Sequence, residues 1–226
     1  MFTKLARAIT VAAREGGGDT EGNATLATAI QKARDYSMPK SNIERAIAKG
    51  TGEGGDGAAI ERVVYEGYGP GGAAILVEAL TDNRNRTGPD VRSSFDRHNG
   101  NLGEPGSVAW IFEKRGVILV DAEAYSEDDL IPAIDAGAED VFPDGDSLRV
   151  LCRPGDLAAI RAALEAANVA IQSSEQTMEP QNTVEITGAN AGTLIRLIEA
   201  LDDLDDVDAV HANFDIAADV LAQAVA

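Results

Sequence analysis

Residues 139–152 read EDVFPDGDSLRVLC, and the pattern within them decides the fold of the chain around them. Two runs, 139–143 and 147–152, have the character of strands, the second with apolar Leu148, Val150 and Cys152 at alternate positions, and the sequence DGD separates them at 144–146. Alternation with a period of two is typical of strands, and an Asp-Gly pair between two such runs favours a tight β-hairpin. The stretch therefore predicts two neighbouring antiparallel strands.

The flanking residues extend this hairpin to a whole domain. A strand that starts at residue 116 and a helix over 127–136 precede the hairpin, whereas a helix over 155–167 and a strand over 169–178 follow it. The order strand–helix–strand–strand–helix–strand is that of the split βαβ arrangement, a ferredoxin-like layer. We therefore expect a ferredoxin-like α/β domain over 121–180.

The N-terminal part of the chain favours helices instead. Apolar residues recur there at helical spacing until the GGG sequence at 16–18. A second helix is predicted over 23–36 and a third from Pro39 onward. The stretch 50–57 contains five glycines and predicts a flexible connection, so that residues 1–57 form an N-terminal helical domain.

The segments on either side of 121–180 predict a second sheet. We expect strands at 63–66, 73–80, 184–187 and 207–214, helices at 87–97 and 189–201, and a hairpin of 108–113 against 117–121. The strands near the C-terminus would complete the sheet that starts at Val63, which makes 121–180 an insertion into a discontinuous α/β domain of 58–120 plus 181–226. The glycine-rich loop 67–72 joins two strands and lacks the Lys-Ser/Thr ending of a P-loop, so a hairpin loop is favoured over a phosphate cradle.

The charge of the chain is strongly asymmetric. The net charge is −19, yet residues 1–115 carry 15 basic and 15 acidic side chains, and residues 116–226 carry 4 and 23. Within residues 1–52 the balance is 8 basic against 5 acidic side chains. A polyanionic partner is therefore expected on the N-terminal side, while the acidic half keeps the protein soluble.

Several features predict the compartment. No uncharged run is long enough to span a bilayer, and no signal segment opens the chain. The single cysteine fits a reducing environment. We therefore expect a cytoplasmic protein.

Few residues suit catalysis. The two histidines, His98 and His211, are far apart in sequence, and Cys152 ends an alternating apolar strand, which favours a buried structural thiol over a nucleophile. The aspartate-rich run 202–208 lacks the glycine and glutamate of a calcium loop and predicts a solvated turn. Trp110 alternates with apolar neighbours, which favours core packing over base stacking. We therefore expect no enzyme, no cofactor and no metal site.

Two groups of basic residues are candidates for phosphate contacts. The sequence DNRNRT at 82–87 lies where a strand ends and a helix begins, so its arginines stand beside free N–H donors that suit an anion. Local pairing with Asp82 and Asp90 is the alternative. The basic residues of the N-terminal helices are typical of a solvated face as well as of a binding surface. The candidate nucleic-acid-binding residues are Lys4, Arg7, Arg14, Lys32, Lys40, Arg45, Lys49, Arg84, Arg86, Arg92 and Arg97.

Four stretches together resemble the YebC family, whose members are widely called probable transcriptional regulatory proteins. They are TVAAREGGGD (10–19), MPKSNIERAIAKGTGE (38–53), YEGYGPGGAAILVEALTDNRNRT (65–87) and NLGEPGSVAWIFEKRGV (101–117). The resemblance implies an N-terminal helical bundle and two α/β domains, one threaded through the other, with no catalytic residues and no cofactor. We therefore expect a mixed α+β fold of three domains, in which the two α/β domains are ferredoxin-like and one is inserted in the other.

The resemblance leaves the target open. Members of the PmpR type resemble DNA-binding regulators of transcription, the mitochondrial relatives resemble translational activators of cytochrome c oxidase, and related bacterial members resemble ribosome-associated factors. No helix dense in Arg, Asn and Gln stands out for reading a DNA groove, so structured RNA on a ribosome fits as well as operator DNA.

The beginning of the chain differs from the family pattern. Family members usually begin with roughly twenty further residues that are rich in Lys, Arg and His, a polyanion-binding arm. Here Met1 stands directly before the FTKL sequence that normally follows that arm. Without the arm we expect weaker and less salt-dependent binding, because fewer counterions are released.

The sequence thus predicts a cytoplasmic, non-enzymatic regulator of gene expression, a DNA-binding transcriptional regulator, that contacts nucleic acid through the N-terminal helices and the 84–97 segment. A ribosome-associated translation factor is the first alternative. A protein-interaction module, whose acidic C-terminal half binds a basic partner, is the second. A hydrolase is the least favoured class because histidine and cysteine are scarce. We expect no membrane partner and no small-molecule substrate. The sequence does not indicate which oligomeric state the chain adopts.

Overall fold

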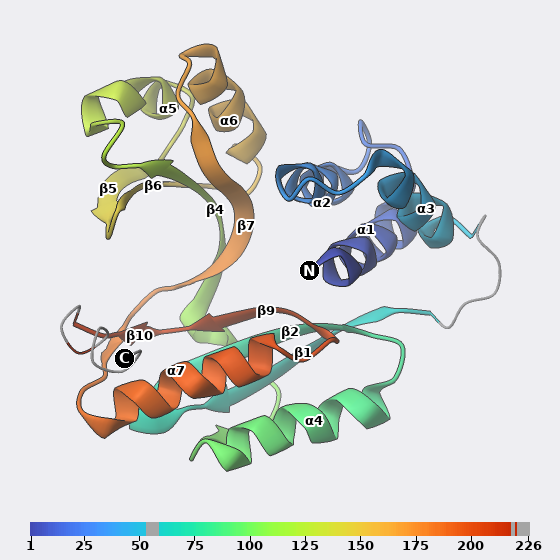
Figure 1. Cartoon of the computed structure of the whole chain (residues 1–226), viewed down its shortest axis with the longest axis vertical. Helices are drawn as coiled ribbons and strands as arrows, with labels where there is room; N and C mark the ends of the chain where they lie inside the picture. The colour runs from blue at the N-terminus through green and yellow to red at the C-terminus, as the bar shows by residue number, and fades with distance from the viewer. Residues whose placement is uncertain (53–58, 218–219, 221–226) are drawn as a thin grey trace. The chain divides into compact units, whose positions relative to one another are not determined.

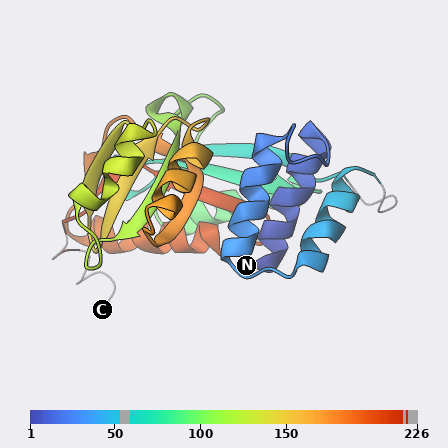
Figure 2. The same cartoon turned by 90° about the horizontal axis from the view of Figure 1, so that it is seen from above.

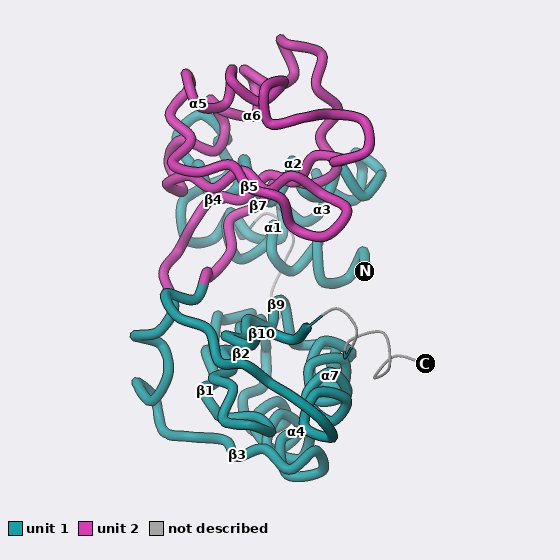
Figure 3. The backbone as a smooth tube through the Cα atoms, turned by 90° about the vertical axis from the view of Figure 1, so that its left-hand side faces the viewer, with its two compact units in different colours: residues 1–112, 180–226 teal, residues 113–179 magenta. Residues whose placement is uncertain are grey.

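The computed structural model describes residues 1–52, 59–217 and 220, which form two compact units. Unit 1 comprises residues 1–112 with 180–226, and unit 2 comprises residues 113–179 (Figure 3). Helices and antiparallel sheets occur together in the chain, so the expected mixed α+β class is confirmed. Most of the glycine-rich connection expected at 50–57, and with it the expected domain boundary at residue 57, lies outside the described residues.

Three helices open unit 1, as expected: α1 (Phe2–Gly16), α2 (Ala24–Asp35) and α3 (Lys40–Gly50). They lie side by side (Figure 2) and share a small aliphatic core that includes Ile9, Leu26 and Ile43. Asn23 caps α2, because its side-chain oxygen accepts a hydrogen bond from the backbone N–H of Leu26 at 3.0 Å.

A glycine sets the spacing between two of these helices. A Cβ atom on Gly50 would lie 2.4 Å from the backbone oxygen of Thr10, so only glycine lets the end of α3 approach α1 this closely.

The rest of unit 1 is a four-stranded antiparallel sheet with two helices on one face (Figure 1). Its strand order is β3-β1-β2-β9. The strands are β1 (Glu61–Tyr68), β2 (Ala74–Thr81), β3 (Asn101–Leu102) and β9 (Val207–Ala212), and the helices are α4 (Arg84–Arg97) and α7 (Ala189–Asp202). Buried side chains such as Phe95, Ile75 and Leu194 fill the space between sheet and helices. The expected hairpin loop at 67–72 is confirmed, and it contains a short 3-10 turn, η1 (Pro70–Gly72).

The C-terminal strands divide between two sheets. β9 joins the main sheet beside β2, as expected. The strand expected at 184–187 does not join it: β8 (Val184–Glu185) pairs in parallel with β10 (Phe214–Asp215) in a separate two-stranded sheet. Asn213 causes the division, because its N–H donates to Ala74 while its own carbonyl accepts from the N–H of Val184. The single strand expected at 207–214 is therefore interrupted at Asn213.

The hairpin expected between 108–113 and 117–121 is wrong. Residues Ala109–Ile111 form a 3-10 turn, η2, and β4 (Phe112–Asp121) then runs through Gly116 without a turn. Gly116 lies opposite Cys152, and a Cβ atom on it would lie 2.6 Å from the cysteine sulfur. The glycine thus serves close approach between two strands, not chain reversal.

Unit 2 has the strand order β5-β6-β4-β7, which is the ferredoxin-like order. Its remaining elements are η3 (Glu127–Leu130), α5 (Ile131–Asp135), β5 (Asp140–Asp144), β6 (Ser147–Cys152), α6 (Leu157–Ala166) and β7 (Ile171–Pro180). The expected turn between β5 and β6 is confirmed, and Gly145 occupies it with a φ of +59°. Within the described residues, no helix is long and apolar enough to span a bilayer.

Candidate nucleic-acid interface

Asp206 is the centre of a buried polar cluster in unit 1. It lies in the turn between α7 and β9, and only 7% of it is exposed. Its carboxylate accepts hydrogen bonds from Arg7 at 2.8 Å, from Arg86 at 2.6 Å and from the hydroxyl of Thr87 at 2.7 Å. Burial raises the pKa of Asp206, but the bonds from Arg86 and Thr87 and the nearby positive charges outweigh burial and lower the pKa below its usual value.

This cluster corrects the expected solvated turn at 202–208. The turn is present, but Asp206 is buried and serves as an acceptor for side chains from α1 and α4. Nothing in the local sequence distinguishes Asp206 from its exposed neighbours Asp203 and Asp205, because its partners lie more than a hundred positions away. Among the described residues, no group of three His, Cys, Asp or Glu side chains is placed to hold a metal ion.

The arginines of the DNRNRT segment pair with carboxylates of the same chain. Arg84 donates two hydrogen bonds to Glu61, the second at 2.6 Å, and Arg86 contacts both Asp206 and Asp82. Asn83 caps α4 through its side-chain oxygen, so the helix begins three residues before the expected start. Of the two partners in the local-pairing alternative, Asp82 contacts Arg86, whereas among the described residues Asp90 forms no ion pair with these arginines; Glu61 and Asp206 are partners that the sequence did not reveal.

Most candidate cations of the N-terminal helices also have partners. Lys4 contacts Asp202, Arg14 donates to the carbonyl of Ile60 at 2.9 Å, and Lys40 lies 3.6 Å from Glu44. The positive charge of Lys32 partly opposes the rise that burial causes in the pKa of the half-buried Asp208.

Four candidates differ from the others. Arg45 and Lys49 on α3, and Arg92 and Arg97 on α4, are exposed and make no ion pair within the described part of the chain. Arg45 and Lys49 are four positions apart and therefore share one face of α3. Among the eleven candidate residues, these four are the ones that ion pairs within the described part of the chain leave available to a polyanion.

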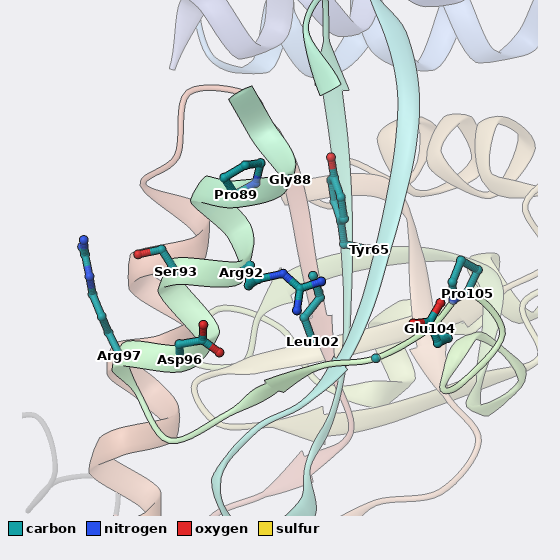
Figure 4. Close-up of a pocket in the computed structure, with 11 residues that line it drawn as sticks. Tyr65, Gly88, Pro89, Arg92, Ser93, Asp96, Arg97, Leu102, Glu104 and Pro105 are labelled. Carbon is teal, nitrogen blue, oxygen red and sulfur yellow. The ribbon is translucent and has the colours of Figure 1, made fainter. Parts of the chain in front are cut away.

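Arg92 extends into a groove between α4 and the loop after β3 (Figure 4). The groove has a volume of about 740 Å³. Tyr65 lies beside it, whereas Arg97 points away from Arg92 (Figure 4). Burial raises the pKa of Tyr65, Arg84 opposes this shift, and Asp206 and Glu61 add to it, so the phenol keeps its proton. The groove therefore offers the unpaired guanidinium of Arg92 beside a neutral aromatic ring, and the carboxylates of Asp96 and Glu104 also line it.

Trp110 lies on the surface, so the expectation of core packing is wrong. The η2 turn breaks the strand alternation: Val108 and Phe112 are buried, and 67% of Trp110 is exposed. The indole Nε1 donates to the backbone oxygen of Ser107 at 3.1 Å, and the Tyr68 hydroxyl donates to the same oxygen at 3.1 Å. The two aromatic rings are thus tied to one backbone atom.

Two residues that were considered for catalysis, Cys152 and His98, lie in environments that suit a structural role. Cys152 is buried, as expected, and burial raises the pKa of its thiol to about 11, which disfavours the reactive thiolate. The Nδ1 atom of His98 lies 2.8 Å from the backbone oxygen of Ser94 in α4.

Comparison with known proteins covers almost the whole chain. Residues 1–53 match the family model for the TACO1/YebC protein N-terminal domain, and residues 60–214 match that for the TACO1/YebC second and third domain. A probable transcriptional regulatory protein of Rubrobacter xylanophilus is 52% identical over 99% of this chain and 90% of its own length. A protein of the same description from Nocardia farcinica is 47% identical over 99% of this chain and 89% of its own length.

A solved structure is also similar. The crystal structure of a conserved hypothetical protein from Aquifex aeolicus has a TM-score of 0.87 and 46% sequence identity, and covers 97% of this chain and 91% of that one. The resemblance found in the sequence is therefore confirmed, and the chain belongs to the TACO1/YebC family.

Proposed function

We propose that this chain regulates gene expression by binding nucleic acid through the unpaired cations of α3 and α4, without a catalytic step. The observation that carries the proposal is the division of the basic residues into paired and unpaired sets. Arg45, Lys49, Arg92 and Arg97 make no ion pair among the described residues, whereas Arg7, Arg84 and Arg86 are held by carboxylates. The names of the relatives, probable transcriptional regulatory proteins, support the regulatory role.

The division matters because binding to phosphate is an exchange of partners. A guanidinium that already pairs with a carboxylate has much of its positive charge neutralised locally, so a phosphate contact adds little. An unpaired surface cation has only water and counterions to release, and this release supplies most non-specific affinity for nucleic acid. Four contacts predict a logarithmic salt slope of about −3.6 for duplex DNA.

Ribosomal RNA is the second candidate target. The exposed ring of Trp110 favours it, because unpaired bases in RNA loops are available for stacking and the bases of a closed duplex are not. A translation factor that acts on the ribosome and a transcription factor that acts on DNA would use the same cations, and they differ in which polyanion binds more tightly.

Charge reversal on α3 tests the proposal. The variant R45E/K49E is compared with the control K114E/R153E, which makes the same change in net charge at two exposed positions of unit 2. Dissociation constants for purified ribosomes and for duplex DNA are measured over a salt series. We expect the α3 variant to bind at least tenfold more weakly than the control and with a shallower salt slope, because each lost phosphate contact reduces the slope by about 0.9.

Each outcome of this experiment has a defined meaning. Saturable ribosome binding that outcompetes DNA assigns the translational role, and sequence-selective DNA binding at physiological salt assigns the transcriptional one. Equal affinities of the α3 variant and the control would contradict the proposed surface. If the unaltered chain binds neither polyanion, the function fails and a protein partner for the acidic half takes its place.

A further inference from the structure

The loop that follows β3 is fixed by one buried carboxylate. Glu66 is 7% exposed, and its side chain accepts hydrogen bonds from the backbone N–H groups of Gly106 at 2.6 Å, Val108 at 2.8 Å and Ala109 at 2.8 Å. Its backbone oxygen also accepts from Gly103 at 2.7 Å. Both ends of the loop 103–109 are thus held by a single residue of β1, and the next residue along the chain is Trp110.

The polar atoms of the aromatic pair face the loop. Since the indole N–H and the Tyr68 hydroxyl both donate to Ser107, neither ring has an unsatisfied polar group that directs it elsewhere. What the pair presents to solvent is ring surface: Trp110 is 67% exposed and Tyr68 is 39% exposed. A binding partner would meet aromatic faces whose position is set before it arrives, so little conformational entropy is lost on binding.

The surroundings favour a small flat ligand over a folded protein. The large apolar neighbours of Trp110 along the chain, Val108, Ile111 and Phe112, are buried, whereas Pro105 and Gly106 are exposed and small. A stable protein interface needs about 800 Å² on each partner with an apolar centre. A nucleic-acid base needs only one ring face, and stacking on an aromatic side chain tolerates every base.

The same loop also borders the groove that contains Arg92. Gly103, Glu104 and Pro105 form one wall of that groove, and Arg92 enters it from α4 (Figure 4). One ordered loop therefore connects an unpaired guanidinium, which suits phosphate, with exposed rings, which suit a base.

We propose that Trp110 and Tyr68 form a stacking site for an unpaired base of a nucleic-acid strand, on a loop that Glu66 holds in place. The inference rests on the proposed function and narrows it, because it assigns a single-stranded or looped target to this edge of the sheet.

Trp110 provides its own probe, because it is the only tryptophan of the chain. The full chain is titrated with an unstructured single-stranded oligouridine RNA and with an RNA duplex of the same length, and the tryptophan fluorescence is recorded. We expect saturable quenching with the single strand and little change with the duplex. The variant W110A should bind the single strand about 5- to 150-fold more weakly, since stacking contributes about 1–3 kcal/mol per base, while W110F retains part of the affinity.

The control variant is Y36A. Tyr36 is 48% exposed and lies after α2, so its removal deletes an exposed aromatic ring at another place in the same unit. Circular dichroism and thermal unfolding check that W110A folds, which we expect because the indole packs little against the core. Y36A should bind both nucleic acids as the unaltered chain does.

The outcomes separate this inference from the proposed function. If the single strand binds with unchanged fluorescence and W110A binds as well as the unaltered chain, the stacking site is overturned while the charge-reversal result stands. If no nucleic acid binds, the proposed function fails and the stacking site with it. A fluorescence change that depends on protein concentration alone would assign Trp110 to contact with a second copy of the chain and overturn the inference.

Discussion

Two buried carboxylates organise different regions of unit 1, and they use different donors. Asp206 accepts from side chains, two of them arginines, and joins residues of α1 and α4 to the turn before β9. Glu66 accepts from backbone N–H groups and fixes a loop. The first arrangement uses cations that would otherwise be available to a polyanion, whereas the second uses none and leaves aromatic rings exposed above an ordered backbone. The comparison shows why basic residues in the sequence are a poor guide to which cations remain unpaired in the folded chain.

The largest expected change in stability follows from replacing Asp206, the centre of the polar cluster. The variant D206N leaves Arg7 and Arg86 without their common carboxylate, and we expect the free energy of unfolding to fall by about 2 kcal/mol. This is less than the roughly 3–5 kcal/mol for a fully buried pair, because both arginines are partly exposed. Urea denaturation measures the change. The control D203N, at an exposed position of the same turn, should unfold as the unaltered chain does, and equal stability of the two variants would break the comparison.

A second variant, E66Q, tests the loop. The amide replaces one acceptor oxygen with a donor, so at least one backbone N–H loses its partner, and we expect a cost of about 1 kcal/mol, the low end of the range for an unsatisfied buried group. We also expect lower fluorescence anisotropy of Trp110, because the loop becomes mobile. The exposed neighbour Glu104 provides the control E104Q, which should leave the anisotropy unchanged. A stable E66Q protein with an unchanged anisotropy would show that Glu66 does not order the loop.

The pH dependence of stability follows from the same two residues. The pKa values of Asp206 and Glu66 lie below the ordinary 3.8 and 4.5, so their carboxylates stabilise the folded state above those values. That contribution is lost as the pH falls through the lower, folded-state pKa values. Unfolding measured from pH 7 to pH 3 should therefore show a smaller loss for D206N and E66Q than for the unaltered chain. If stability falls with pH equally in all three proteins, the lowered pKa values of Asp206 and Glu66 are contradicted.

Replacing Asp208 should change the free energy of unfolding least, and in the opposite direction to the replacements of Asp206 and Glu66. Burial raises its pKa, an effect that Arg62, Lys32 and Lys4 partly oppose and to which Glu78 adds. A raised folded-state pKa means that stability is lost as the pH rises through it. We expect D208N to be slightly more stable than the unaltered chain at pH 7, with the difference vanishing near pH 3. A destabilised D208N at pH 7 would show that Asp208 acts as an ion-pair partner instead.

The regular elements of both units could be predicted because their signals are local. The three N-terminal helices, the β5–β6 hairpin and the ferredoxin-like order of unit 2 follow from periodicity and turn residues that are close in sequence. Gly116 misled the prediction because a glycine within a strand gives the same signal as a turn, and only the position of Cys152 on the neighbouring strand distinguishes them.

The candidate site was less predictable, because whether each basic side chain is paired depends on carboxylates that are distant in sequence. The basic residues were recognisable, but Arg7 meets Asp206 across 199 positions of sequence, and Arg84 meets Glu61 across 23. Exposure of Trp110 depends on a single 3-10 turn, which interrupts an alternation that would otherwise bury the indole. Glu66 gave no signal at all, because its partners are backbone groups.

The most direct test of the account compares two arginines on one helix. Arg92 is unpaired and Arg84 is held by Glu61, so the neutral variants R92Q and R84Q make the same chemical change to two residues of α4 that differ in pairing. Affinity for single-stranded RNA at low salt is the measurement. We expect R92Q to bind several-fold more weakly and R84Q to bind as tightly as the unaltered chain. Equal losses for both variants, or a loss for R84Q alone, would contradict binding through the unpaired cations.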